Sequence, residues 1–165
     1  MNEAPNNHGS DTALCPRCGQ PGRSVSELTM KMLVTEPAKA RLKSAIGFCF
    51  CTTPKCGVAY FQPASGECVL QEELRVVVFQ KSADPKRLVC YCFGHTVEAI
   101  QLEARATGFS RILEEIKGQC AQGLDQCERT NPQGSCCLGN VQRVIREAAG
   151  RKSLPSSGSS SSCCH

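Results

Sequence analysis

Alternating and clustered apolar positions predict short strands in the first half of the chain. Residues 25–34 alternate apolar and polar side chains, which favours a strand, although Leu28 and Met32 also suit one face of a helix. Residues 58–61 form a short apolar run that is typical of a strand. Residues 74–79 predict the clearest strand, because their centre is β-branched and apolar.

Helical patterns dominate the second half, with one short helix before it. Residues 37–45 predict a helix that begins at a proline, which the first helical turn tolerates. Thr96 is a suitable N-cap for a helix that ends before Gly108, since its hydroxyl can accept a hydrogen bond from an unpaired backbone N–H.

Two more helices are expected after Gly108. Ser110 can cap a helix over 111–117, which Gly118 would stop. Residues 138–149 place apolar and charged side chains on opposite sides, which predicts an amphipathic helix. We interpret its arginines as a solvated face, with docking to an acidic redox partner as the alternative.

The composition points to metal binding. The chain holds 14 cysteines, no tryptophan and few aromatic residues, so a small core needs covalent or metal staples. The first residues lack a basic start and an apolar run, which argues against a signal peptide, and no apolar stretch reaches the roughly 18 residues of a membrane span. We therefore expect a cytoplasmic protein with reduced thiols, where metal is favoured over disulfides. A net charge of +4 with scattered basic residues does not indicate nucleic-acid binding.

Two closely spaced cysteine pairs in the first half indicate a structural zinc site. Cys15 and Cys18 form a C-x2-C pair, and Cys51 and Cys56 form a C-x4-C pair. Four thiolates from two such turns are a common zinc ligand set. Cys49 competes with Cys51, which is preferred for its more usual spacing.

Cysteines in the second half indicate an iron–sulfur cluster. Cys90 and Cys92 project from the same side of an extended backbone, because side chains alternate faces. After a helix-like stretch come Cys127 and the adjacent pair Cys136-Cys137. Four thiolates are the usual ligands of a 2Fe–2S cluster. A second zinc site is the simpler alternative.

The order of these motifs resembles the N-terminal metal domain of the CopZ-type copper chaperones. The C-x4-C pair is followed by the strand-like residues 58–61, then by the motif of residues 90–96 and by that of 127–137. The second half in turn resembles the bacterioferritin-associated ferredoxins. The resemblance covers roughly residues 14–150.

The resemblance implies both metals and a role in copper homeostasis. It assigns zinc to the four cysteines of the first half, and it assigns the cluster to Cys90, Cys92, Cys127 and Cys137. The cluster would supply an electron that reduces Cu(II) to Cu(I), the form that a copper-exporting P-type ATPase accepts. We expect the chaperones' C-terminal heavy-metal-associated domain to be missing here. As a hypothesis, residues 163–165, Cys-Cys-His, offer soft ligands to Cu(I) or mercury; an incidental sequence is the alternative.

Several neighbours of these motifs have two interpretations. Cys68, Cys120 and Cys136 are interpreted as small buried residues. His95 is either an ordinary exposed or capping histidine or a hydrogen-bond donor to the cluster. We also expect Cys92 and Cys137 to lie just before helices, whose N-terminal dipoles would raise the reduction potential.

These observations predict an α+β protein of two small units. The expected domains are a zinc-stapled, β-rich part at 14–86 and a helical 2Fe–2S part at 87–150, between disordered tails at 1–13 and 151–165. The leading functional hypothesis is metal handling with one-electron transfer. The alternatives are a ferredoxin-like docking module without copper chemistry and a zinc-only interaction protein. No hydrolase or transferase motif stands out.

Overall fold

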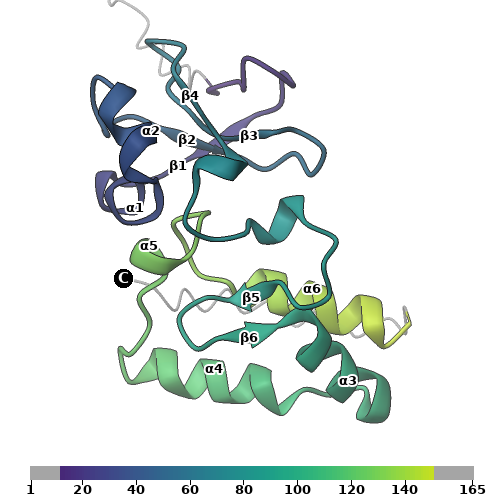
Figure 1. The fold of residues 1–165 in the computed structure, drawn as a ribbon. Coiled ribbons are helices and arrows are strands. Elements are labelled where there is room, and N and C mark those ends of the chain that lie inside the picture. The colour runs from purple at the N-terminus through teal and green to yellow at the C-terminus, as the bar shows by residue number, and fades with distance from the viewer. Residues whose placement is uncertain (1–11, 151–165) are drawn as a thin grey trace, which may run out of the picture.

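The computed structural model describes residues 12–150, and both predicted tails, apart from Thr12 and Ala13, lie outside the described residues. The first half is built on a four-stranded antiparallel sheet with the order β1-β2-β3-β4 (Figure 1). Its strands are β1 (Gly22–Ser24), β2 (Cys49–Cys51), β3 (Val58–Phe61) and β4 (Cys68–Leu70). The strand predicted over 58–61 is confirmed as β3.

Two short helices, α1 (Glu27–Leu33) and α2 (Glu36–Arg41), pack on this sheet. The alternating pattern of 25–34 therefore gave the wrong element, and the helical alternative is confirmed. Ser26 caps α1 by accepting a hydrogen bond from the backbone of Thr29. The helix buries Met30 against the sheet, in a core that includes Phe50 and Tyr60. The segment forms a helix rather than a strand because its apolar side chains are buried along one helical face.

The second half is mainly helical and has its own core. A two-stranded antiparallel sheet precedes four helices, of which α3, α4 and α6 are the long ones (Figure 1). The elements are β5 (Leu88–Cys90), β6 (His95–Thr96), α3 (Val97–Thr107), α4 (Arg111–Ala121), α5 (Cys127–Thr130) and α6 (Leu138–Ala148). The chain is thus a mixed helix-and-sheet protein with a β-rich first part.

Most helix boundaries follow the predicted signals. Thr96 accepts from the backbone of Ala99, and Gly108 adopts a left-handed conformation with φ 70° at the end of α3. The predicted end of α4 at Gly118 is wrong, because the helix continues to Ala121. Ile116 and Cys120 are one turn apart and both buried, so packing carries the helix past the glycine. The hydroxyl of Ser110 does not cap α4.

The strand predicted over 74–79 is also wrong. Leu74 makes one isolated bridge with Val34, and two turns of 3-10 helix, η1 (Gln71–Glu73) and η2 (Phe79–Lys81), flank the segment. The hydroxyl of Tyr91 accepts from Phe79 N and donates to Val77 O, which takes up backbone groups that a strand would pair. We call residues 77–81 the strap, because they connect the two halves.

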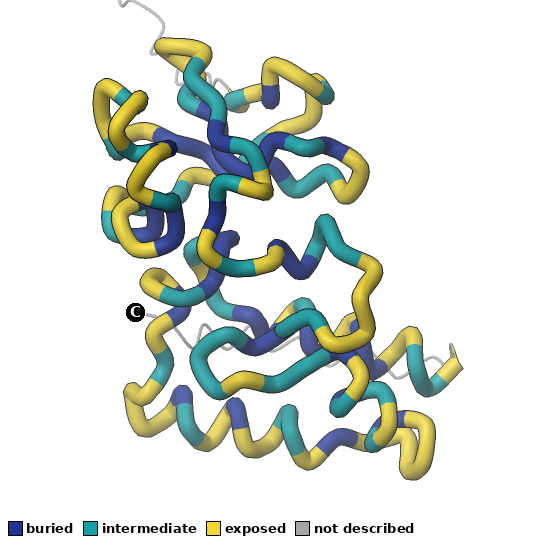
Figure 2. Tube along the Cα trace, viewed as in Figure 1, coloured by how far each residue is buried: buried dark blue, intermediate teal, exposed yellow. Residues whose placement is uncertain are grey.

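The two halves contact each other through buried polar groups. Helix α5 lies against α1, and the loop after α5 lies under the sheet (Figure 1). Figure 2 shows the buried residues concentrated in the sheet and on the inner sides of the helices. Across residues 12–150, none of the helices combines the length and the apolarity that a membrane span requires.

Candidate metal centres

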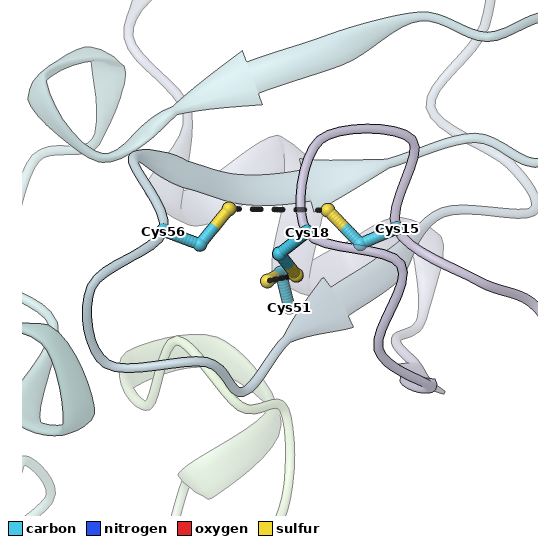
Figure 3. A group of neighbouring side chains, drawn as sticks. All are labelled: Cys15, Cys18, Cys51 and Cys56. Atoms are coloured by element: carbon cyan, nitrogen blue, oxygen red, sulfur yellow. Dashed lines mark hydrogen bonds between the residues drawn. The ribbon is translucent and has the colours of Figure 1, made fainter.

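The four cysteines predicted to bind zinc come together in the structure. The sulfurs of Cys15, Cys18, Cys51 and Cys56 all lie within 4.8 Å of one another (Figure 3). Cys15 Sγ is 4.0 Å from Cys56 Sγ, and Cys18 Sγ is 3.7 Å from Cys51 Sγ. Zinc–sulfur bonds of about 2.3 Å in a tetrahedron place sulfurs ~3.8 Å apart. The group therefore has the size and donor set of a closed, structural zinc site.

Two tight turns and the end of a strand present these thiols. Gly19, at φ 71°, closes the first turn, and its N–H donates to the carbonyl of Cys15 at 2.8 Å. Cys51 ends β2, and Cys56 follows a turn closed by its own N–H on Thr53 O. Cys49 lies on the same strand two residues earlier, which is about 7 Å along an extended chain. Its sulfur is not a member of the group.

The thiols of this group differ in acidity. A hydrogen bond with the Thr53 hydroxyl, at 3.2 Å, lowers the pKa of Cys18 to about 6. Burial raises the pKa of Cys15 to about 12. Cys18 is thus the thiolate from which metal binding can begin, since zinc binds thiolate rather than thiol.

The predicted cluster ligands also converge, in a different arrangement. Cys92 Sγ lies 3.5 Å from Cys127 Sγ, the side chain of Cys127 contacts that of Cys137, and Cys137 contacts Cys90. The four sulfurs form a string of contacts. Within the part of the chain that the structure describes, they do not gather around one point as the four sulfurs of the zinc group do. A string of thiols suits a two-iron cluster better than one ion, because two irons hold their thiolates apart.

Two of these four thiols are strongly acidic. Contacts with the Cys127 and Cys90 thiols lower the pKa of Cys137 to about 4. The pKa of Cys92 is lowered to about 6, first by the Cys127 thiol and then by the Thr130 hydroxyl. The backbone N–H of Gln126 also donates to Cys92 Sγ at 3.1 Å. Thiolates therefore form readily at Cys92, one end of the string, and at the inner member Cys137, whereas contact with Cys137 raises the pKa of Cys90 at the other end.

A buried atom beside the string lacks a partner among the described residues. His95 Nε2 is buried without a hydrogen bond, and His95 lies near Cys137. Buried polar atoms are rarely left in this state. A sulfur acceptor of a bound cluster would satisfy it, so the residues present fit a cluster.

Sequence reasoning missed some contributors to this centre. Cys136 is half-buried rather than a buried bystander, and its side chain contacts Cys127. The Thr130 hydroxyl and the Gln126 N–H, which both bond to Cys92 Sγ, left no sequence signal, because their positions depend on α5. Cys137 is the N-cap of α6, as expected, but the end of the turn 91–94 and strand β6 separate Cys92 from α3. The helix-dipole argument therefore applies to Cys137 alone.

Comparison with known proteins gives consistent results for both halves. Residues 12–75 match a family described as a zinc-binding domain of the CopZ type. The chain is 31% identical over 138 residues to the copper chaperone CopZ of Archaeoglobus fulgidus, covering 84% of this chain and 64% of that protein. The crystal structure of the N-terminal domain of that protein superimposes with a TM-score of 0.67 at 30% identity, over 79% of this chain and 96% of the domain.

Proposed function

Because the chain belongs to the family of CopZ-type N-terminal domains, we propose that it is a cytoplasmic metal-handling protein of copper homeostasis. It binds structural zinc in its first half and a 2Fe–2S cluster in its second half. Its task is to reduce Cu(II) to Cu(I) for a copper-exporting P-type ATPase. The convergence of two cysteine groups of different shape is the observation that carries this proposal.

The zinc ligands we propose are Cys15, Cys18, Cys51 and Cys56. All four positions of a tetrahedron are taken by protein thiols, three of which are buried. A site without an open position supports folding rather than catalysis. Zinc here staples the turns to the strands of a sheet whose strands are three or four residues long.

The cluster ligands we propose are Cys90, Cys92, Cys127 and Cys137. A bound cluster supplies a one-electron couple, so one electron from an external reductant reduces one Cu(II) to Cu(I). The chain's own residues determine where that electron leaves. Cys92 is half-exposed, whereas Cys90, Cys127 and Cys137 are buried. Copper therefore approaches most closely on the side of Cys92.

The proposal is tested on the full chain, purified without oxygen. We expect about one zinc and two irons per chain and a brown colour that bleaches on reduction. Adding Cu(II) to the reduced protein in the presence of a Cu(I)-specific chromophoric chelator should yield one Cu(I) per cluster. Cys92→Ser should abolish the iron and the copper reduction, and Cys68→Ser should abolish neither.

Other outcomes select the competing functions. A colourless protein with two zinc ions would identify a zinc-only interaction protein and overturn the proposal. A protein with an intact cluster that leaves Cu(II) unreduced would be a ferredoxin-like docking module. Transfer to the ATPase is tested separately, by mixing the Cu(I)-loaded protein with the metal-binding domain of such an ATPase and following the copper.

A further inference from the structure

We infer that the zinc-binding half holds the cluster-ligand turn in its ligating shape, through Tyr60 and through the strap at 77–81. The inference rests on the proposed function, since it presupposes a cluster on Cys127 and Cys137. Tyr60 and Lys81 are positioning residues in this arrangement. They contact the loops that carry the ligands, and they do not ligate metal themselves.

The turn at 131–137 is a compact unit between two of the proposed cluster ligands. The side chain of Asn131 accepts from Gln133 N at 3.1 Å and donates to Ser135 O at 3.1 Å. The side chain of Gln133 donates to Cys136 O at 2.8 Å. Asn131 and Gln133 are both buried. These bonds fix the turn internally, but they do not fix it relative to Cys90 and Cys92.

Tyr60 ties the turn to the zinc-stapled sheet. Its hydroxyl donates to the carbonyl of Pro132 at 2.6 Å, and the side chain is fully buried. Tyr60 belongs to β3, which starts shortly after Cys56 and pairs with the strand that ends at Cys51. Burial raises the pKa of Tyr60, so the hydroxyl keeps its proton and remains a donor. Without it, a buried carbonyl loses its partner.

The strap also forms hydrogen bonds with both segments that carry the proposed cluster ligands. The hydroxyl of Tyr91, between Cys90 and Cys92, bonds to Phe79 N at 2.9 Å and to Val77 O at 2.6 Å. The side-chain amide of Gln80 donates to Gln133 Oε1 at 2.7 Å. The strap therefore contacts both ligand segments, one through its backbone and the other through the side chain of Gln80.

Lys81 connects the strap to the zinc turn. Its ammonium group donates to Thr53 O at 2.7 Å and to Cys56 O at 3.0 Å. These carbonyls belong to the turn that presents Cys56, so metal binding there fixes the acceptors of Lys81. Zinc with four thiolates also carries net negative charge, which favours a nearby cation. Loss of this turn's shape would remove the hydrogen bonds of Lys81 to the first half and leave the strap held there by the buried side chain of Val78.

The inference is tested with Tyr60→Phe and Lys81→Met in the full chain, purified without oxygen. We expect an excess of an iron chelator to bleach the cluster on the order of tenfold faster in Tyr60→Phe, because a buried acceptor is left unpaired. Lys81→Met should bleach several-fold faster, and Lys81→Arg should restore most of the wild-type rate. Zinc per chain should stay at the wild-type value. Lys55→Met is the matched control, since Lys55 is an exposed lysine of the same turn.

A second measurement distinguishes positioning from general destabilisation. Both variants should change the visible circular dichroism of the cluster, which reports the arrangement of its ligands, at temperatures where the fold is intact. Wild-type bleaching rates and spectra in both variants would overturn the inference and leave the proposed function standing. If Tyr60→Phe does not fold, Lys81→Met decides. A wild-type protein without a cluster would overturn the proposed function and this inference together.

Discussion

A fifth cysteine lies beside each of the two centres, Cys49 near the proposed zinc ligands and Cys136 near the proposed cluster ligands. For Cys49, the structure distinguishes it from the proposed ligands. Cys49 and Cys51 face the same side of β2, and only Cys51 Sγ lies with the other three sulfurs. We expect Cys51→Ser to lose zinc, because the tetrahedron loses a thiolate. Cys49→Ser should keep one zinc per chain. Zinc content measured by mass spectrometry under native conditions decides, and equal loss in both variants would contradict the assignment.

His95 supplies a second prediction for a single residue. Its buried Nε2 has no partner among the described residues, and the residue lies near Cys137. An N–H donor at a sulfur stabilises the reduced cluster, which carries one more negative charge. We expect His95→Ala to lower the reduction potential by about 30–60 mV, equivalent to roughly 1 kcal/mol for one electron.

The potential is measured by redox titration of the visible absorption. His95→Gln is the matched variant, because it retains a side-chain donor, and it should lie between the wild type and His95→Ala. An unchanged potential in His95→Ala would show that the nitrogen does not face the cluster.

Local signals predicted the helices better than the strands. Thr96 and Gly108 bound α3 as expected, because caps and left-handed glycines act over a few residues. The 74–79 segment has strand-like side chains, but Tyr91 occupies its backbone groups from a distance in sequence. The grouping of the four thiols proposed to bind zinc could be predicted from spacing. The tie of Tyr60 to Pro132 could not, because it joins residues 72 positions apart.

The position of Gly118 inside helix α4 can be tested, since the sequence predicted that this glycine ends the helix. A Cβ added at Gly118 meets nothing within 4 Å, and the residue lies inside the helix. We expect Gly118→Ala to raise the free energy of unfolding by about 0.5–1 kcal/mol, because alanine loses less backbone entropy in a helix. Gly108→Ala is the matched control.

Gly108 also has open space around it, but its φ is 70°. Alanine in that left-handed conformation should cost about 1–2 kcal/mol. Urea denaturation followed by helical circular dichroism measures both changes. No stabilisation by Gly118→Ala would contradict the boundary of α4 described above, and stabilisation by Gly108→Ala would contradict the end of α3 at Gly108.

At the scale of the whole molecule, the two halves have separate apolar cores but share buried hydrogen bonds. Thr29 on α1 donates to Glu128 O at 2.6 Å, and Tyr60 donates to Pro132 O. Both donors are completely buried. The Pro132 acceptor is also buried, and a buried acceptor that loses its donor costs about 1–3 kcal/mol, so the Tyr60 bond alone is worth a large share of the stability of a small domain. Glu128 is exposed, and its bond with Thr29 is partly buried, so it adds less. We therefore expect the halves to unfold together.

Thermal unfolding tests this coupling with one probe in each half. Helical circular dichroism reports mainly on α3, α4 and α6, and zinc release to a chromophoric chelator reports on the sheet. In the wild type the two curves should coincide, as a two-state transition requires.

The double variant Thr29→Val, Tyr60→Phe should separate the two unfolding curves by several degrees, because it removes hydrogen bonds between the halves and little apolar contact. Thr107→Val, whose hydroxyl bonds only within the second half, leaves the bonds between the halves intact and should shift both curves together. Two separate transitions already in the wild type would mean that zinc and cluster occupy independent domains, and the coupling proposed between them would then have no structural basis.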